Sequence, residues 1–210
     1  GARRRQVRNS QVNANATENA FPPHLWITSG DRDHVTQIDT DAASVLGVYG
    51  VGDDPSRTAV DLRGDVWIDG RCDASLWRIR ASECAQPGCS AAQMNSSYKD
   101  RYTLPYTNAS CDGGGVAVDR YGTPWVGFHD DRVVAKVDRS TGQVLEEANI
   151  PGRVHGLVAD RYDFIWADEY QEKQITKIDA LTGQVIASYQ PSDGLCFRPY
   201  GVAVDARGRI

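Results

Sequence analysis

The sequence predicts an all-β fold, and two observations carry that prediction. Its 210 residues include 20 Gly and 9 Pro and few strong helix formers, a composition typical of short strands joined by tight turns. The second observation is a repeat, because Trp26, Trp67, Trp125 and Trp166 are separated by 41, 58 and 41 residues. Hydrophobic residues at 40% and charged residues at 24% are ordinary globular values, which excludes a wholly disordered chain.

The repeat extends beyond the tryptophans. The string Gly-Val-Ala-Val-Asp occupies 115–119 and 201–205, and Gly-Leu-Val-Ala-Asp occupies 156–160. Lys136-Val-Asp-Arg-Ser-Thr-Gly-Gln-Val144 returns 41 residues later as Lys177-Ile-Asp-Ala-Leu-Thr-Gly-Gln-Val185. The long interval of 58 residues equals one period of 41 plus 17, so the second repeat carries a 17-residue insertion.

Each repeat is predicted to form four short antiparallel strands. In the third repeat they cover 116–119, 124–127, 133–138 and 143–148, and the same set follows 41 residues later. Four antiparallel strands in a repeat of about 40 residues form the blade of a β-propeller. We expect the repeat tryptophans to pack between adjacent blades, and the aspartate ending each first strand to hold the next turn. These aspartates are Asp61, Asp119, Asp160 and Asp205.

The motif Gly-Val-Ala-Val-Asp-x-x-Gly-x-x-Trp-Val, followed by Val-x-Lys-Val-Asp-x-x-Thr-Gly, resembles NHL-type propellers, and especially the streptogramin B lyase-like group. The resemblance covers residues 24–210 and leaves residues 1–23 as a basic and polar N-terminal arm. Propellers with such repeats usually have six or seven blades, whereas this chain supplies about four. We therefore expect an open arc, an excerpt of a larger propeller, with closure into a four-bladed ring as the alternative.

Charge separates the arm from the propeller body. Residues 1–23 carry four arginines against Glu18, a net charge of +3, while the whole chain carries −5 and the remainder therefore −8. Because nucleic-acid phosphates need a basic face, no nucleic-acid partner is expected. No apolar run approaches the roughly 18 residues that a membrane-spanning helix needs, so no membrane span is expected.

Cysteines and sequons indicate an oxidising compartment. Five cysteines are present, several of them in a polar insertion at about 81–113, and N-glycosylation sequons begin at Asn15, Asn95 and Asn108. The sequence therefore predicts a secreted, extracellular glycoprotein with disulfide bonds.

The blade frame also predicts how the cysteines pair. Cys72 lies in the loop after a second strand and Cys111 in the connection to the next blade, and these loops share one face of the propeller. Cys72 and Cys111 are therefore expected to bond. Cys84 and Cys89 lie on the opposite face and would pair locally. Cys196 is expected to be unpaired, or bonded to a missing segment or another chain.

His155 is the clearest candidate for acid–base chemistry. It precedes the first strand of its repeat, and Glu169 follows the second strand, so both side chains can converge on one face. A histidine beside a carboxylate can act as a general acid or base. Streptogramin lyase-like propellers resemble this arrangement, with a divalent metal nearby, and the resemblance implies a β-elimination. No other repeat has histidine at this position, so a loop-stabilising role is the alternative.

Three aspartates are candidate metal ligands. Asp130, Asp131 and Asp168 occupy corresponding loops of neighbouring blades, together with Glu169, and could gather around Ca²⁺ or Mg²⁺, which prefer carboxylate oxygens. A solvated acidic rim is the alternative.

The function predicted from these features is that of a non-enzymatic binding or assembly module. A lyase-like enzyme using His155 and Glu169 with a divalent metal is the second hypothesis. The third is a structural subunit of an extracellular assembly. The expected partner is a protein or a glycan, with self-assembly through the N-terminal arm or an open blade edge.

Overall fold

The computed structural model describes residues 24–83, 91–107, 109–112, 114–190, 198–205 and 207–210. The expected arm with Asn15 lies outside these residues, as do Asn108, Cys84, Cys89 and Cys196. The described part of the chain forms fifteen strands and one α-helix, α1 (Ala91–Ser97). None of its helices is long and apolar enough to cross a membrane.

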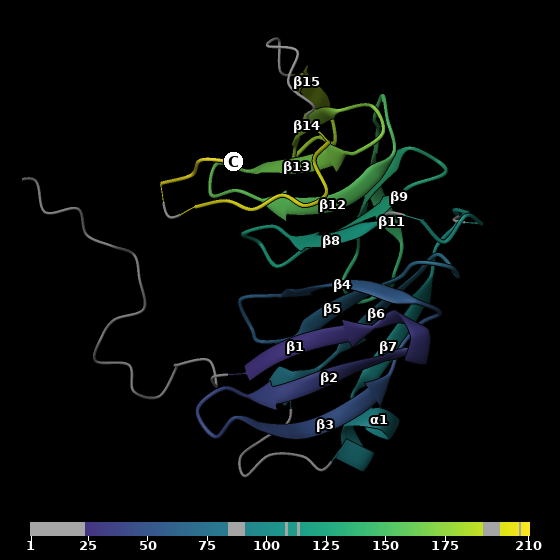
Figure 1. The fold of residues 1–210 in the computed structure, drawn as a ribbon, viewed down its shortest axis with the longest axis vertical. Coiled ribbons are helices and arrows are strands. Elements are labelled where there is room, and N and C mark those ends of the chain that lie inside the picture. The colour runs from purple at the N-terminus through teal and green to yellow at the C-terminus, as the bar shows by residue number, and fades with distance from the viewer. Residues whose placement is uncertain (1–23, 84–90, 108, 113, 191–197, 206) are drawn as a thin grey trace, which may run out of the picture.

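The strands form four antiparallel sheets, and within each sheet neighbouring strands follow one another in the chain (Figure 1). We number these sheets as blades one to four. Blade one contains β1 (His24–Ser29), β2 (His34–Asp39) and β3 (Ser44–Gly50). Blade two contains β4 (Pro55–Val60), β5 (Val66–Gly70), β6 (Ser75–Ile79) and β7 (Lys99–Thr103). Blade three contains β8 (Gly115–Val118), β9 (Pro124–Phe128), β10 (Val133–Val137) and β11 (Val144–Asn149). Blade four contains β12 (Val154–Ala159), β13 (Phe164–Glu169), β14 (Gln174–Asp179) and β15 (Val185–Tyr189). The predicted all-β fold is confirmed, as are the strands predicted for the third and fourth repeats.

The insertion of the second repeat lies between β6 and β7. It contains a short 3-10 turn (Ala81–Glu83) and α1, whose Met94 is buried with Trp26 and Tyr49 of blade one. The insertion therefore fills the space between blades one and two. Strand β7 falls within the range 81–113, so that range includes one strand of the blade itself.

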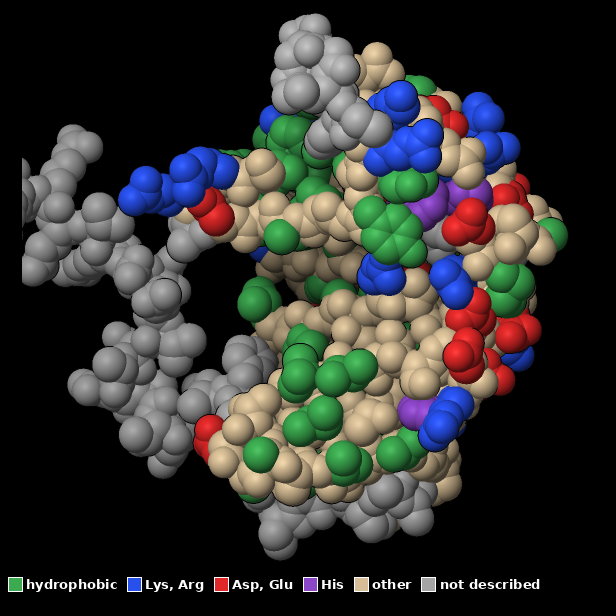
Figure 2. All heavy atoms as spheres, viewed as in Figure 1, with side chains coloured by type: hydrophobic (Ala, Val, Ile, Leu, Met, Phe, Trp, Pro, Cys, Tyr) green, Lys and Arg blue, Asp and Glu red, His purple; other side chains and the backbone are tan. Residues whose placement is uncertain are grey.

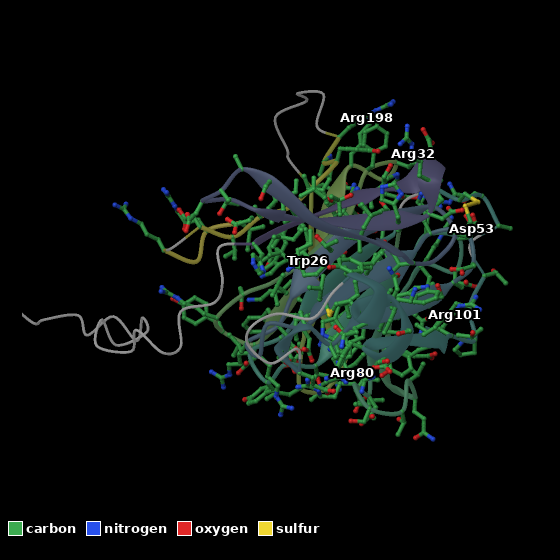
Figure 3. All side chains as sticks on the ribbon, turned by 90° about the horizontal axis from the view of Figure 1, so that it is seen from below. Trp26, Arg32, Asp53, Arg80, Arg101 and Arg198 are labelled. Carbon is green, nitrogen blue, oxygen red and sulfur yellow. A yellow bond between two sulfur atoms is a disulfide. The ribbon has the colours of Figure 1, made fainter. Side chains whose placement is uncertain are left out.

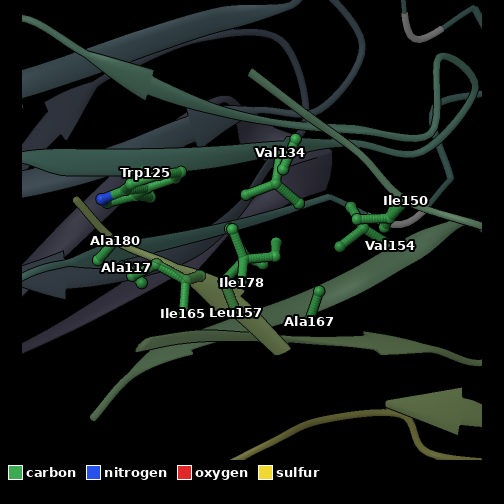
Figure 4. Close-up of a cluster of buried hydrophobic side chains, with 11 residues drawn as sticks. Ala117, Trp125, Val134, Ile150, Val154, Leu157, Ile165, Ala167, Ile178 and Ala180 are labelled. Carbon is green, nitrogen blue, oxygen red and sulfur yellow. The ribbon is translucent and has the colours of Figure 1, made fainter. Parts of the chain in front are cut away.

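Adjacent blades pack through two different faces of their sheets. We call the face that carries the repeat tryptophan the tryptophan face, and the opposite face of the same strands the aliphatic face. Figure 4 shows the boundary between blades three and four, where the tryptophan face of one, with Trp125, meets the aliphatic face of the next, with Ile165 and Ile178. The same contact recurs at the two earlier boundaries, around Trp26 and Trp67.

The aspartate at the end of each first strand fixes the following turn. Asp119 Oδ1 accepts hydrogen bonds from the backbone N–H groups of Tyr121 (2.9 Å) and Thr123 (3.0 Å), and Oδ2 accepts one from Trp125 Nε1 (3.3 Å). One carboxylate therefore ties the turn to the buried tryptophan. Equivalent bonds occur at Asp61 and Asp160.

The expected first strand at 202–205 is not formed. Strand β8 has the same sequence and is held by its ladder to β9, whereas residues 201–205 have no such neighbour among the described residues. The turn that follows is nevertheless made, because Asp205 Oδ1 accepts the N–H groups of Arg207 (2.8 Å) and Arg209 (3.0 Å). No sheet pairs this segment with β1, so the described blades form an open arc.

Candidate functional site

The loops after second strands and before first strands gather on one side of the arc. Cys72 follows β5 and Cys111 precedes β8, and a disulfide joins them with their Cα atoms 4.4 Å apart. Figure 3 shows this bond in yellow beside Asp53, whose carbonyl oxygen accepts the N–H of Cys72 (3.1 Å). The two cysteines paired by sequence reasoning are thus bonded in the structure. The bond holds the neighbouring residue, Asp112, at the entrance to β8.

Three potential metal ligands meet on this side, one from each of three successive segments. Asp112 precedes β8, His129 follows β9, and His155 lies in β12. His155 Nε2 lies 3.7 Å from Asp112 Oδ1, and His129 Nε2 lies 4.0 Å from Asp112 Oδ2. Figure 2 shows histidine side chains beside acidic ones at the right-hand edge of the molecule. The two imidazoles are 3% and 4% exposed, so they form a nearly buried pair beneath an exposed carboxylate.

The other ring nitrogen of each histidine has an acceptor of its own. His129 Nδ1 lies 3.0 Å from Asp130 Oδ1, and His155 Nδ1 lies 3.4 Å from the carbonyl oxygen of Arg153. These contacts favour a proton on Nδ1 and leave the Nε2 lone pairs directed at Asp112. Burial lowers the pKa of His155, which favours its neutral form.

Aromatic rings surround the pair. The His155 ring centroid lies 5.0 Å from that of His129, 5.3 Å from that of Tyr170 and 5.7 Å from that of Tyr200. The guanidinium of Arg57, from blade two, lies 5.9 Å from the Tyr200 ring centroid. The cluster is thus built from blades two, three and four and from the segment after blade four.

Glu169, the predicted partner of His155, is engaged elsewhere. It ends β13 and is fully buried, and its carboxylate accepts hydrogen bonds from Thr176 Oγ1 and from Gln174 Nε2 (2.6 Å) on β14. Burial raises its pKa. The carboxylate that stands against the His155 imidazole is instead that of Asp112.

The structure does not bring the predicted aspartate ligands together as one metal group. Asp130 accepts hydrogen bonds from Ser110, and Asp131 accepts one from the N–H of Thr107 (2.6 Å), so both organise the loop before β8. Asp168 is buried in β13, and the backbone N–H groups of His155 and Gly156 approach its carboxylate without reaching hydrogen-bond geometry. Burial raises the pKa of Asp168 to about 7, against a lowering by the charge of Arg57. The Ca²⁺ or Mg²⁺ site stays a prediction without support from these contacts.

The sequon at Asn95 lies on α1. The side-chain amide of Asn95 donates a hydrogen bond to the carbonyl oxygen of Val48 in β3 (3.2 Å). Glycosylation at Asn95 stays a prediction.

Sequence reasoning missed Asp112 and His129. Neither lies at a position that the 41-residue period singles out, because the equivalents of His129 are Tyr170 in blade four and Arg71 in blade two. The signal was available in the blade frame. The loop after the second strand of one blade lies on the same face as the loop before the first strand of the next blade. The reasoning that paired Cys72 with Cys111 therefore also predicts that His129 lies near His155.

The two end blades present faces that inner blades bury. The aliphatic face of blade one exposes Leu25, Ile27 and Val48, and Figure 2 shows hydrophobic side chains gathered over the sheet that Figure 1 labels β1 to β3. On the tryptophan face of blade four, Trp166 is only partly buried and Tyr189 is 50% exposed.

No family model and no curated protein matches the chain. Several solved structures do. A streptogramin B lyase structure has 20% identity and a TM-score of 0.69, over 90% of this chain and 58% of that one. Selenomethionine-substituted virginiamycin B lyase from Staphylococcus aureus has 17% identity and a TM-score of 0.66, over 85% and 55%. Hydrazine synthase from Kuenenia stuttgartiensis has 13% identity and a TM-score of 0.63, over 87% and 52%. The chain therefore has the β-propeller fold of the streptogramin B lyase structures and spans little more than half of their length.

Proposed function

We propose that this chain is a secreted, non-enzymatic propeller module that assembles with further blades of its own repeat type through its two end faces. One observation carries the proposal. Ile27 in blade one and Ile68 in blade two occupy the same repeat position, 41 residues apart, yet Ile27 is 47% exposed and Ile68 is fully buried. Ile68 is buried against the tryptophan face of blade one, and Ile27 lacks such a neighbour among the described residues.

The two end faces are complementary to each other. Every inner boundary joins a tryptophan face to the aliphatic face of the next blade. Blade four offers the first kind of face, with Trp166 and Tyr189, and blade one offers the second. A blade of a second copy can therefore repeat the inner contact head to tail. Removing exposed apolar surface from water at about 25 cal/mol per Å² is the driving force.

Secretion is part of the proposal. The Cys72–Cys111 disulfide is the kind of bond that persists in oxidising compartments, and sequons accompany it in the sequence. The expected partner is thus a second copy of this chain, met in an extracellular compartment.

The test is the oligomeric state of the chain in solution, measured by sedimentation velocity across a concentration series. The wild-type chain should self-associate at micromolar concentrations, and Ile27→Lys should weaken the association at least tenfold. Leu145→Lys is the matched control, because Leu145 is 49% exposed on β11 of an inner blade. Deleting residues 1–23 should leave the association unchanged. A wild-type chain that stays monomeric, or equal weakening by both lysine variants, contradicts the proposal.

A lyase-like enzyme is the second candidate, favoured by the nearly buried His155 imidazole against a carboxylate. One of the similar structures is a catalytically inactive virginiamycin B lyase with quinupristin. The test is turnover of quinupristin by this chain. Under the lyase hypothesis, His155→Ala and Asp112→Asn, which remove the imidazole and the carboxylate beside it, should each reduce turnover about 10²–10⁴-fold. Absence of turnover in the wild-type chain contradicts it.

A further inference from the structure

Beyond assembly, the cluster of Asp112, His129 and His155 has the chemistry of a transition-metal site. Each residue offers one ligand atom, and these three atoms all lie within 4.8 Å of one another. We propose that Asp112, His129 and His155 bind one Zn²⁺ ion through one carboxylate oxygen and two Nε2 atoms, across the boundary between blades three and four.

His129 provides an observation that a merely structural pair does not explain. Its side chain is 3% exposed, and its Nε2 atom is buried with no hydrogen-bond partner among the described residues. A buried ring nitrogen without a partner costs free energy, so such atoms normally find a hydrogen-bond donor or an ion. Because this atom lies 4.0 Å from an oxygen of the Asp112 carboxylate, a cation bound there would give the imidazole nitrogen a partner.

The outer contacts of the histidines orient them as metal ligands. A metal-binding histidine donates its other N–H group to a carboxylate or a backbone carbonyl, which fixes the ring and keeps the ligating nitrogen unprotonated. His129 has Asp130 in that role and His155 has the carbonyl of Arg153. Both kinds of acceptor are thus present, one for each ring.

The donor set selects the metal. Two imidazole nitrogens and one carboxylate oxygen suit Zn²⁺, whereas Ca²⁺ and Mg²⁺ take mostly oxygen ligands. Zn²⁺ bonds of about 2.0–2.2 Å in tetrahedral geometry require ligand atoms about 3.3 Å apart. The three ligand atoms lie within 4.8 Å of one another, so each pair needs to shorten by about 1.5 Å or less to reach that spacing. Asp112 supplies the adjustable ligand, because its side chain is 55% exposed.

The proposed site lies at the boundary between blades three and four, so a bound ion would affect how these blades hold together. Asp112 and His129 flank β8 and β9 of blade three, and His155 belongs to β12 of blade four. A bound ion would therefore link two blades and stabilise their boundary. The open fourth position would face the exposed side of Asp112, where solvent or a ligand atom could bind.

The test is isothermal titration of ZnCl₂ into the full chain, freed of metal with chelator and carrying no affinity tag. The wild-type chain should bind one equivalent and gain thermal stability. Asp112→Asn and His129→Gln should each lose at least tenfold in affinity, and Asp130→Asn about 10–100-fold. His34→Gln is the control, because His34 lies in β2 of blade one and should leave binding unchanged.

Asp112→Asn should leave the protein folded, because it changes an exposed side chain to one of the same shape. The far-ultraviolet circular dichroism spectrum of this variant should match that of the wild type, which separates loss of zinc binding from loss of folding. Replacing Zn²⁺ by Co²⁺ should give visible absorption bands of a low-symmetry site that Asp112→Asn removes. Absence of Zn²⁺ binding, binding unaffected by Asp112→Asn and His129→Gln, or equal binding of Ca²⁺ would each overturn the proposal. None of these measurements depends on self-association, so the zinc-binding proposal and the assembly proposal are tested independently.

Discussion

The aliphatic faces of blades one and two carry closely similar side chains in the same register, Leu25, Ile27 and Ile38 in one and Val66, Ile68 and Ile79 in the other. Those of blade two are fully buried, whereas Leu25 and Ile27 are about half exposed. The repeat pattern therefore specifies a surface that needs a neighbouring blade, and only the neighbour decides whether the apolar area is removed from water. Patches of this kind on a soluble protein usually mark an interface.

The largest expected effect is on the inner face. Ile68→Ala should lower the free energy of unfolding by about 2–5 kcal/mol, because it leaves a cavity at a packed boundary. Ile27→Ala, at the same repeat position, should lower it by less than about 1 kcal/mol at concentrations where the chain is monomeric. Urea unfolding measures both changes. Equal losses would show that the two faces are buried alike.

The Cys72–Cys111 disulfide links blades two and three outside the hydrophobic core, so removing it measures how much this link stabilises the protein. Replacing both Cys72 and Cys111 by Ala should lower the free energy of unfolding by about 2–4 kcal/mol, because the unfolded chain regains the freedom of the closed loop. A reductant should destabilise the wild type by a similar amount and the double variant much less. If a reductant shifts both proteins equally, another cysteine pair carries the effect.

Blades two and four also differ in an equivalent buried carboxylate. Asp69 Oδ1 accepts the N–H groups of Ser56 (3.2 Å) and Arg57 (2.5 Å), whereas the equivalent N–H groups of His155 and Gly156 approach Asp168 without hydrogen-bond geometry. Burial raises the pKa of Asp69 to about 6 and that of Asp168 to about 7. The folded protein thus holds protons that the unfolded chain releases near pH 4, and stability falls as pH rises from about 4 to about 7.

Replacing Asp69 or Asp168 by asparagine removes the buried negative charge and should restore stability at high pH. At pH 8, Asp168→Asn should be more stable than the wild type by about 1–3 kcal/mol, and the difference should shrink as the pH falls towards 4. Asp69→Asn should gain less, because the amide gives up two backbone hydrogen bonds to a carboxylate. Thermal unfolding from pH 4 to pH 8 checks both variants. A constant difference across that range would mean that Asp168 is ionised in the folded state throughout.

Much of the fold was predictable because the sequence repeats every 41 residues and each repeat forms one blade. The tryptophan spacing placed the strands of blades three and four, and the same frame paired Cys72 with Cys111. The segment at 201–205 could not be predicted from its own residues, because a strand also needs a neighbour to accept its hydrogen bonds. Identical sequence forms β8 where that neighbour exists.

The candidate site was predictable only in part. His155 stood out because its repeat position is occupied by other residues in the other blades. Asp112 lies in the connection before β8, which is longer than the corresponding connections before β4 and β12. His129 lies in a loop of constant length whose residues differ between repeats, so the repeat places the loop but does not single out the histidine. Glu169 illustrates the opposite error, since proximity in the blade frame does not reveal that Thr176 and Gln174 already bind its carboxylate.

The most direct measurement of head-to-tail docking mixes two variants, each with one end face disabled. Ile27→Lys keeps only the tryptophan face of blade four, and Tyr189→Lys keeps only the aliphatic face of blade one. By sedimentation velocity each variant alone should be monomeric, and an equimolar mixture should form a one-to-one dimer and nothing larger. A mixture that stays monomeric, or variants that associate alone as strongly as the wild type, would contradict the account that these two faces dock on each other.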